Sequence, residues 1–288
     1  MMARVLARRI LLGAAGLIAT ILPPALSAQN FWDRLPQDEV VDFAFGRAVA
    51  DTVAGPEATD TFTRLFDNDV PYEGGAATAL QSPTFLGNHD AGRFAHFVRK
   101  ANLKVSDDEM LNRVIVGHAM LLTLRGAPMI YSSDAHGFTG DGNDQDAGED
   151  MFASRLASYN DNKLVGTMLT AVQNNFDQKY PLYEALAKPS ALRLGTLALM
   201  SGKQLIRNYQ ERSGLFAVLQ IDPAIDLEVV MAFNMSATAI TRNVEVSTNS
   251  VNFQSLHGAC GANAVARGSY PVTIALLDFI VYVAGDIE

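Results

Sequence analysis

The sequence predicts an α/β region over residues 29–201 and a small all-β sandwich over residues 202–288. Two observations carry this prediction. From about residue 35 to residue 200, short apolar runs of strand type alternate with helical stretches, which is typical of parallel α/β architecture. Beyond residue 202, short β-type runs separated by Asp, Pro, Gly and Asn follow one another without a helix between them, which indicates an all-β domain.

Residues 1–28 are predicted to be a secretory signal peptide. Three arginines, Arg4, Arg8 and Arg9, precede an apolar run at 10–21, and two prolines and a series of small residues ending at Ala28 follow it. The alternative is a membrane anchor, but the apolar run is short for a bilayer span. The Arg8–Arg9 pair is a weak indication of twin-arginine export. We therefore expect a secreted or periplasmic protein without a membrane association after cleavage.

The charge balance is acidic. The whole chain has 22 basic and 31 acidic side chains, and loss of residues 1–28 would leave 19 basic side chains and a net charge of −12. Such a surface argues against nucleic acid and anionic membranes as partners. Cys260 is the only cysteine, so no intrachain disulfide is possible, and we expect it to be a small buried apolar residue.

The α/β region begins with a β-type run at 35–45 and helical stretches at 47–54 and 57–66. Phe62, Leu65 and Phe66 recur there at three- and four-residue spacing, which indicates an apolar helix face. The other elements expected in this region are strands at 84–87 and 127–131, the second of them buried, helices at 107–124, 153–158, 164–174 and 182–200, and a polar loop at 134–149.

The clearest helix is the one at 107–124, which is apolar along most of its length and begins with three acidic residues, where the helix dipole favours them. His118 lies in it and is expected to be a structural histidine. The last helix of the region, 182–200, contains Pro189, which is expected to disturb it. In the all-β domain the expected strands are 215–221, 227–234, 244–247, 251–253 and 272–283.

Three polar residues, Asn88, His89 and Asp90, follow the strand at 84–87 directly, and Arg93 comes three residues later. A buried strand that ends in this way places polar groups at its C-terminal rim, where barrel enzymes keep their chemistry. Adjacent histidine and aspartate side chains can hydrogen-bond vicinal sugar hydroxyls, and an ionised aspartate makes strong bonds. The alternative is a polar turn in which Asp90 caps the next helix.

The second motif is the run from Arg125 to Tyr131, followed by Asp134 and Gly137-Phe138. This run resembles the eighth barrel strand of the α-amylase family of glycoside hydrolases, and Asn-His-Asp-x-x-Arg resembles the seventh. The resemblance extends over residues 35–279. The family's eighth strand ends in a Tyr-Tyr-Gly-Asp-Glu type of sequence, whereas this chain has Tyr-Ser-Ser-Asp-Ala-His at 131–136, which puts the substrate contacts at this rim in question.

The resemblance implies the C-terminal portion of a (β/α)8 TIM barrel, about three strands, followed by a small all-β sandwich. It also implies a retaining glycosidase that acts on α-glucosidic bonds in an α-glucan or malto-oligosaccharide. Asp90 matches the family's transition-state aspartate and His89 its neighbouring substrate histidine. The further residues that we expect to bind substrate are Asn88, Arg93, Tyr131 and Asp134.

No segment of the sequence matches the strand ends that carry the family's nucleophile and acid/base. We therefore expect a truncated enzyme that is inactive alone, although a faulty gene model would give the same sequence. Two alternatives stay open: a non-catalytic α-glucan-binding remnant, and a half-enzyme completed by a second chain. Whether the parent activity was hydrolysis or glycosyl transfer also stays open.

The loop at 141–152 has oxygen-bearing side chains at alternate positions, as a calcium loop does. An EF-hand loop requires glycine at its sixth position and glutamate at its twelfth, and this loop has Asp146 and Phe152 there. We therefore expect a solvated loop and no metal or other cofactor, with a structural calcium as the alternative.

Overall fold

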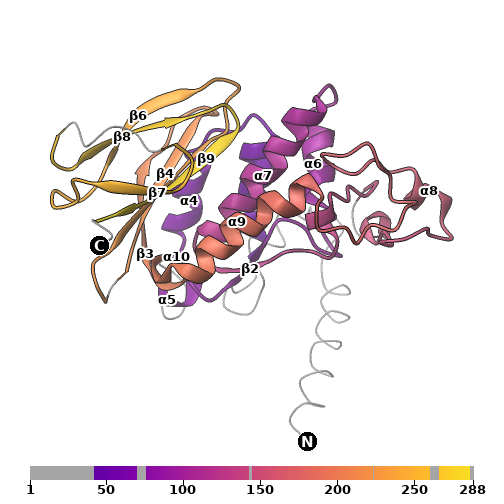
Figure 1. The fold of residues 1–288 in the computed structure, drawn as a ribbon, viewed down its shortest axis with the longest axis horizontal. Helices are drawn as coiled ribbons and strands as arrows, with labels where there is room; N and C mark the ends of the chain where they lie inside the picture. The colour runs from indigo at the N-terminus through magenta and orange to yellow at the C-terminus, as the bar shows by residue number, and fades with distance from the viewer. Residues whose placement is uncertain (1–41, 70–75, 143–144, 223, 260–265, 286–288) are drawn as a thin grey trace, which may run out of the picture.

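The computed structural model describes residues 42–69, 76–142, 145–222, 224–259 and 266–285 (Figure 1). Its parallel part is small. Strand β1 (Pro83–Phe85) pairs with β2 (Ala127–Met129), and Asp42 forms a parallel bridge with Thr84 on the other side of β1. Asp42, β1 and β2 therefore lie side by side in parallel. The expected signal peptide and residues 35–41 of the expected β-type run at 35–45 lie outside the described residues. The end of that run is not a strand, because Phe43 begins helix α3.

Helices α3 (Phe43–Val49), η1 (Ala50–Ala54), α4 (Thr61–Asp67) and α5 (Ala76–Ala79) lie between Asp42 and β1. The helix expected at 47–54 is confirmed, with a π-helical turn at η1. The helix expected at 57–66 forms only from Thr61. The Asp42 carboxylate caps α3 by accepting a 2.8 Å hydrogen bond from the Phe45 amide. Asp42 therefore both bridges to β1 and caps the helix that follows it.

Helices α6 (Phe94–Ala101) and α7 (Asp107–Thr123) connect β1 to β2. The prediction for α7 is confirmed, and the Ser106 hydroxyl caps it by accepting a hydrogen bond from the Glu109 amide at 3.2 Å. Helix α6 was not expected, because its eight residues are few for a periodic pattern. Its N-cap is Arg93, so Asp90 does not cap it as the alternative for the polar turn proposed.

Two expectations for the region after β2 are wrong. Residues 164–174 are not helical; Leu164 donates its amide to the Leu169 carbonyl, and its side chain lies in a small core with Phe138, Ala171 and Tyr180. Of the expected helix at 153–158, only α8 (Ala157–Asn160) forms. Contacts between distant residues outweigh local helix propensity in this segment.

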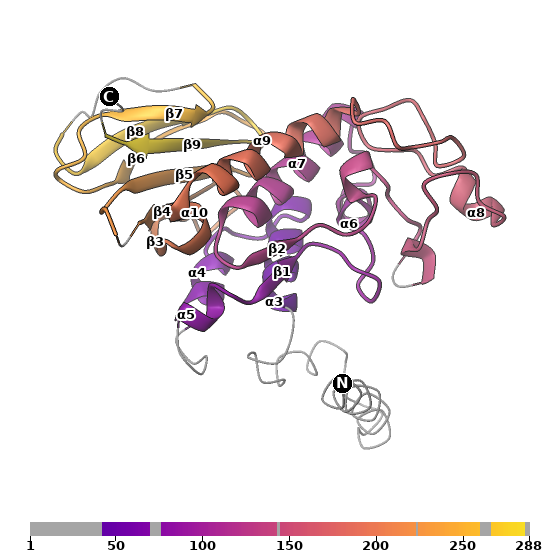
Figure 2. The ribbon, with the colours of Figure 1, turned by 60° about the horizontal axis from the view of Figure 1, so that its bottom comes forward.

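Helix α9 (Pro181–Gly195) runs alongside α7 through the centre of the molecule (Figures 1 and 2). It continues through Pro189, and the break in the expected helix comes at Thr196, before α10 (Leu197–Ser201). Strand β2 is also less buried than expected, and Met129 and Ile130 are exposed. Among the strands that the structure describes, β2 pairs with β1 alone.

The antiparallel part has five strands in the order β3-β4-β5-β9-β7, with a two-stranded β6-β8 sheet beside them. The expected strand at 272–283 is in fact two strands separated by a turn, and β3 was not expected because its residues are largely polar. The bounds are β3 (Lys203–Asn208), β4 (Leu215–Ile221), β5 (Glu228–Asn234), β6 (Ile240–Glu245), β7 (Phe253–His257), β8 (Ser269–Ile274) and β9 (Asp278–Ala284).

The central strands of the five-stranded sheet, β4, β5 and β9, are buried on both faces. Leu215 and Ala217 of β4 face the β6-β8 sheet and share a core with it, which makes the predicted sandwich. Phe216 and Val218, which alternate with them, belong to the core formed with helices α4, α7 and α9. Figure 2 shows the resulting layers of helices and sheets, with the loops around α8 at the far end.

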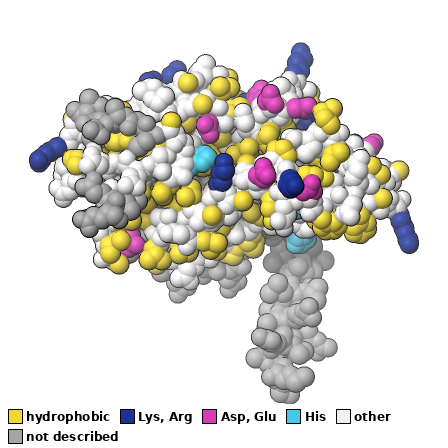
Figure 3. Space-filling model, viewed as in Figure 1, with side chains coloured by type: hydrophobic (Ala, Val, Ile, Leu, Met, Phe, Trp, Pro, Cys, Tyr) yellow, Lys and Arg dark blue, Asp and Glu magenta, His cyan; other side chains and the backbone are white. Residues whose placement is uncertain are grey.

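The loops around α8 expose several large apolar side chains, and Figure 3 shows apolar atoms along the lower edge at this end of the molecule. The most exposed of them are Phe152, Leu156, Met168 and Phe176. Among the described ranges, no helix combines the length and the apolar character that a bilayer span requires.

Replacing Gly117 with alanine is expected to destabilise the chain by about 1–3 kcal/mol, although alanine is the better helix former. A Cβ at this position of α7 would lie 2.4 Å from Cε1 of the buried Phe94 ring. Gly195, at the end of α9, is the matched control, because a Cβ there meets no atom within 4 Å. Thermal unfolding of both variants checks this, and a stabilised Gly117→Ala would contradict it.

Candidate active-site rim

The carboxyl ends of β1 and β2 meet at one edge of the parallel sheet, because the register pairs Phe85 with Met129. The two segments that carry the sequence-predicted site residues, 86–93 and 130–134, therefore start next to each other. We refer to these two segments together as the rim. Both strand-end motifs lie at one edge as a direct consequence of the parallel pairing.

A closed turn carries the Asn-His-Asp triplet. The backbones of Asn88 and Gly92 exchange two hydrogen bonds of 3.1 and 3.0 Å, and the Asn88 side-chain oxygen accepts from the amides of Asp90 and Ala91 at 2.9 and 2.7 Å. Gly87 is required for this closure, since a Cβ there would lie 2.5 Å from the Gly92 carbonyl oxygen. The Asn88 side chain therefore shapes the turn.

His89 and Asp90 point outward from this turn. Their side chains are 80% and 58% exposed, and His89 Nε2 lies 3.5 Å from Asp90 Oδ1. Neither side chain is committed to a buried partner, so both can face a ligand. A ring nitrogen and a carboxylate at this separation can address neighbouring hydroxyls of one sugar.

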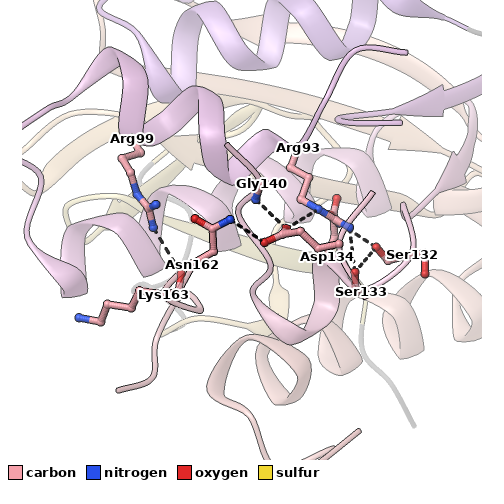
Figure 4. A network of polar contacts seen from close by, with 9 residues as sticks. Arg93, Arg99, Ser132, Ser133, Asp134, Gly140, Asn162 and Lys163 are labelled. Atoms are coloured by element: carbon pink, nitrogen blue, oxygen red, sulfur yellow. Dashed lines mark hydrogen bonds and ion pairs between the residues drawn. The ribbon is translucent and has the colours of Figure 1, made fainter. Parts of the chain in front are cut away.

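Arg93 is buried beneath the turn and joins it to the segment after β2 (Figure 4). Its guanidinium donates to the Ser132 carbonyl at 2.7 Å, to the Ser133 hydroxyl at 3.0 Å and to Asp134 Oδ1 at 2.6 Å. Its Nε lies 3.1 Å from Glu149 Oε2. We refer to Arg93, Asp134 and Glu149 together as the clamp. The two predicted substrate residues Arg93 and Asp134 thus contact each other inside the protein.

Burial disfavours the charged forms of the acids in the clamp. It raises the pKa of Asp134 to about 6, although the charge of Arg93 acts in the opposite direction. Burial likewise raises the pKa of Glu149. His118 Nε2 lies 4.0 Å from Asp134 Oδ2, and burial lowers the pKa of His118 to about 4, against a hydrogen bond between its Nδ1 and the Val114 carbonyl.

His118 and Asp134 are expected to contribute opposite pH dependences to stability. The pKa of His118 falls on folding from 6.5 to about 4, so the unfolded chain binds the proton first and stability falls as the pH drops through that window. The pKa of Asp134 rises from 3.8 to about 6, so the folded chain binds the proton first and stability increases as the pH drops through that window.

The variants His118→Leu and Asp134→Asn separate these contributions. Between pH 7 and pH 4.5, His118→Leu should lose less unfolding free energy than the parent, because its buried imidazole is gone. Asp134→Asn should lose more, because the compensating carboxyl is gone. Urea unfolding across the pH range measures both slopes, and slopes parallel to the parent's would contradict the assignment.

The comparisons with known proteins give the family that the two strand-end motifs resemble. The chain is 32% identical to an α-amylase of Streptomyces lividans over 221 residues, which cover 77% of this chain and 24% of that protein. The chain is a relative of the α-amylase family. It spans about a quarter of the length of this curated relative, and no protein-family model matches it.

Solved α-amylases share the fold of this α-amylase relative. The Anoxybacillus α-amylase superposes with a TM-score of 0.64 and 16% identity, over 86% of this chain and 47% of that one. The Geobacillus thermoleovorans α-amylase, solved in complex with acarbose, gives a TM-score of 0.65 and 15% identity, over 86% of this chain and 48% of that one. The expected fold class, the C-terminal part of a TIM barrel followed by a β domain, is confirmed.

One predicted site residue of this α-amylase relative, Tyr131, packs on the clamp. Tyr131 is half-buried and its ring lies on the Arg93 guanidinium, with 4.7 Å from Cζ to the ring centroid.

Glu149 was not among the predicted site residues, because it lies 56 positions after Arg93 in a loop rich in acids that look alike in the sequence. Within the described ranges, no cluster of three His, Cys, Asp or Glu side chains could hold a metal ion.

Proposed function

We propose that this chain provides the sugar-holding side of a glycosidase that acts on α-glucans. The observation that carries the proposal is the exposed His89–Asp90 pair, held on a closed turn at the carboxyl edge of the parallel strands. The 32% identity to an α-amylase supports the same ligand class, as does the fold shared with an α-amylase that binds acarbose. The Asn88 side chain holds the turn closed, Tyr131 presents a half-buried ring, and the buried pair of Arg93 and Asp134 supports the turn without contacting the sugar.

The role of Asp90 is to accept hydrogen bonds from two hydroxyls of the sugar and to hold them more strongly as positive charge develops on the ring. Retaining hydrolysis also requires a nucleophile and a proton donor. No strand end in the sequence matches those of the family that carry these groups. We therefore propose that hydrolysis requires a segment that carries them, either in a longer form of this chain or in a second polypeptide.

We also propose a secreted or periplasmic location, on the basis of the predicted signal peptide at 1–28, and the division into an α/β region and an all-β domain near residue 202. The acidic charge and the neutral ligand class are compatible with an extracellular polysaccharide as substrate. Fractionation of cells that express the full chain, with N-terminal sequencing of the released protein, tests the location.

Replacing Asp90 with asparagine is expected to weaken acarbose binding by roughly tenfold to a hundredfold, the loss of one charge-assisted interaction of about 1.5–3 kcal/mol. Isothermal titration calorimetry on the full chain measures it. Glu211→Gln is the matched control, because Glu211 is an exposed acid in the loop before β4. Equal affinity in Asp90→Asn and the parent would overturn the assignment of Asp90.

A reducing-sugar assay on starch distinguishes a binding remnant from an enzyme. The proposal predicts no release by the chain alone, and release when a polypeptide with the first five barrel strands is added. If the chain alone released reducing sugar and Asp90→Asn abolished the release, the proposal that hydrolysis requires a further segment would be wrong. Binding of acarbose without release under either condition would favour the non-catalytic alternative.

A further inference from the structure

We infer that Arg93 is a positioning residue: with Asp134 and Glu149 it holds the turn that carries His89 and Asp90 at a set distance from Tyr131. The inference rests on the proposed function only for its ligand-binding consequence. The geometry of the clamp itself involves no ligand. Two of its members, Arg93 and Asp134, came from the sequence as substrate contacts, and the structure shows their side chains facing each other instead.

The first step is the link between Arg93 and the turn. Arg93 follows Gly92, whose backbone closes the turn by two hydrogen bonds with Asn88. Gly87 packs against the backbone at the same place, where a Cβ would lie 3.2 Å from Arg93 Cα. The turn therefore has little freedom relative to the Arg93 backbone, and a displacement of Arg93 moves His89 and Asp90 with it.

The second step is the link between Arg93 and the other half of the rim. The guanidinium makes three hydrogen bonds to consecutive residues, Ser132, Ser133 and Asp134, and the Tyr131 ring covers its face. Ser133 has a positive φ of 67°, a conformation that a non-glycine residue keeps only when its surroundings hold it. The guanidinium thus sets both the path of this segment and the orientation of the Tyr131 ring.

The third step is the support from Glu149. Its carboxylate accepts hydrogen bonds from the Gly140 amide at 2.7 Å and from the Asn162 side-chain amide at 3.0 Å. Its Oε2 lies 3.1 Å from Arg93 Nε, as an ion pair and not as a hydrogen bond. The clamp therefore draws a third and a fourth segment, around 140 and 162, to the same point (Figure 4). Asp134 lies at Nη1 and Glu149 at Nε of the same guanidinium, so the charge of one rigid fork faces both carboxylates.

The opposite end of the strands provides a matched comparison. Arg125, just before β2, is equally buried and pairs with Asp42 at 2.7 Å and with Asp69. It has the same chemistry, but its partners include no residue of the rim. If a substitution only weakens a buried ion pair, substitutions at Arg93 and at Arg125 should affect the rim equally. If Arg93 positions the rim, only the substitution at Arg93 should affect it.

The experiment compares Arg93→Lys with Arg125→Lys in the full chain, at a temperature where both are fully folded. Lysine keeps the charge but replaces the fork by a single ammonium. Amide hydrogen exchange of segments 88–92 and 131–140, without ligand, is the first measurement, and acarbose affinity by calorimetry is the second. We expect Arg93→Lys to speed exchange in both segments and to weaken acarbose by roughly tenfold, and Arg125→Lys to leave both unchanged.

Glu149→Gln is the second variant, in case Arg93→Lys does not fold. It keeps the shape of the side chain and removes its charge, so exchange should increase in the same two segments to a smaller extent. Unchanged exchange in the Arg93 and Glu149 variants, or an equal increase in Arg125→Lys, would overturn the inference. If the parent chain does not bind acarbose, the proposed function fails, while the ligand-free exchange still decides whether the clamp positions the rim.

Discussion

Replacing Arg125 with methionine is expected to lower the free energy of unfolding by about 3–5 kcal/mol at pH 7, because the change leaves two buried carboxylates without their cation. Arg125 lies between Asp42 and Asp69, and all three side chains are largely withdrawn from water. Burial opposes the charged form of Arg125, but the two aspartates outweigh it and raise its pKa. Burial also raises the pKa of Asp69 despite the attraction to Arg125.

The ion pairs of Arg125 are therefore costly to break, although their net contribution to stability is small. The expected loss is the free-energy cost of leaving the carboxylates of Asp42 and Asp69 buried without a cation. Urea unfolding followed by circular dichroism gives the value. Arg64→Met is the control, because Arg64 pairs with Asp60 at 2.9 Å on the surface and its side chain is 63% exposed. A surface pair contributes about 0–1 kcal/mol, so equal losses in the two variants would refute the prediction.

Replacing Phe216 with alanine is expected to cost about 3–5 kcal/mol, the usual loss for a fully buried phenylalanine. Phe216 lies on β4 with no exposed surface, and its ring centroid is 4.7 Å from that of Phe62 and 6.2 Å from that of Phe66 on α4. These rings join the five-stranded sheet to the helices that support the parallel strands. Their loss should therefore lower the stability of both parts together.

A double-mutant cycle with Phe62→Ala tests this connection. The two rings should show a coupling energy of about 0.5–1.5 kcal/mol. The exposed Phe176, which is 57% exposed in the loops around α8, gives the control variant Phe176→Ala, whose loss should be small. Strict additivity of Phe62→Ala and Phe216→Ala would mean that α4 and the sheet do not stabilise each other through these rings.

The elements that the sequence predicts best are those whose signal is local. Helix α7 combines a serine cap, an acidic first turn and a long apolar run, and β4 and β5 are nearly continuous apolar runs of strand length. Each of these patterns is stabilised by residues close in sequence or by burial on both faces of a sheet. The prediction therefore does not depend on knowing the partner element.

The elements that the sequence predicts poorly depend on distant partners. Residues 164–174 have helix-like apolar spacing, but Leu164 and Ala171 belong to a core with Phe138 and Tyr180. Strand β3 has little apolar content, and it forms because β4 offers an edge to pair with. In both cases the free energy of the tertiary contacts exceeds the intrinsic conformational propensity of the segment, which is roughly a few tenths of a kcal/mol per residue.

For the candidate site, the amino-acid sequence shows which residues follow the two strands, and hence that Asn88, His89 and Asp90 lie at a strand end. Which of the polar residues face solvent and which face each other depends on the tertiary fold. Arg93 and Asp134 are 41 positions apart and Glu149 is further still, and periodicity contains no information on such pairings. Burial makes an unpaired charge costly, so the fold brings these three together and leaves His89 and Asp90 free at the surface.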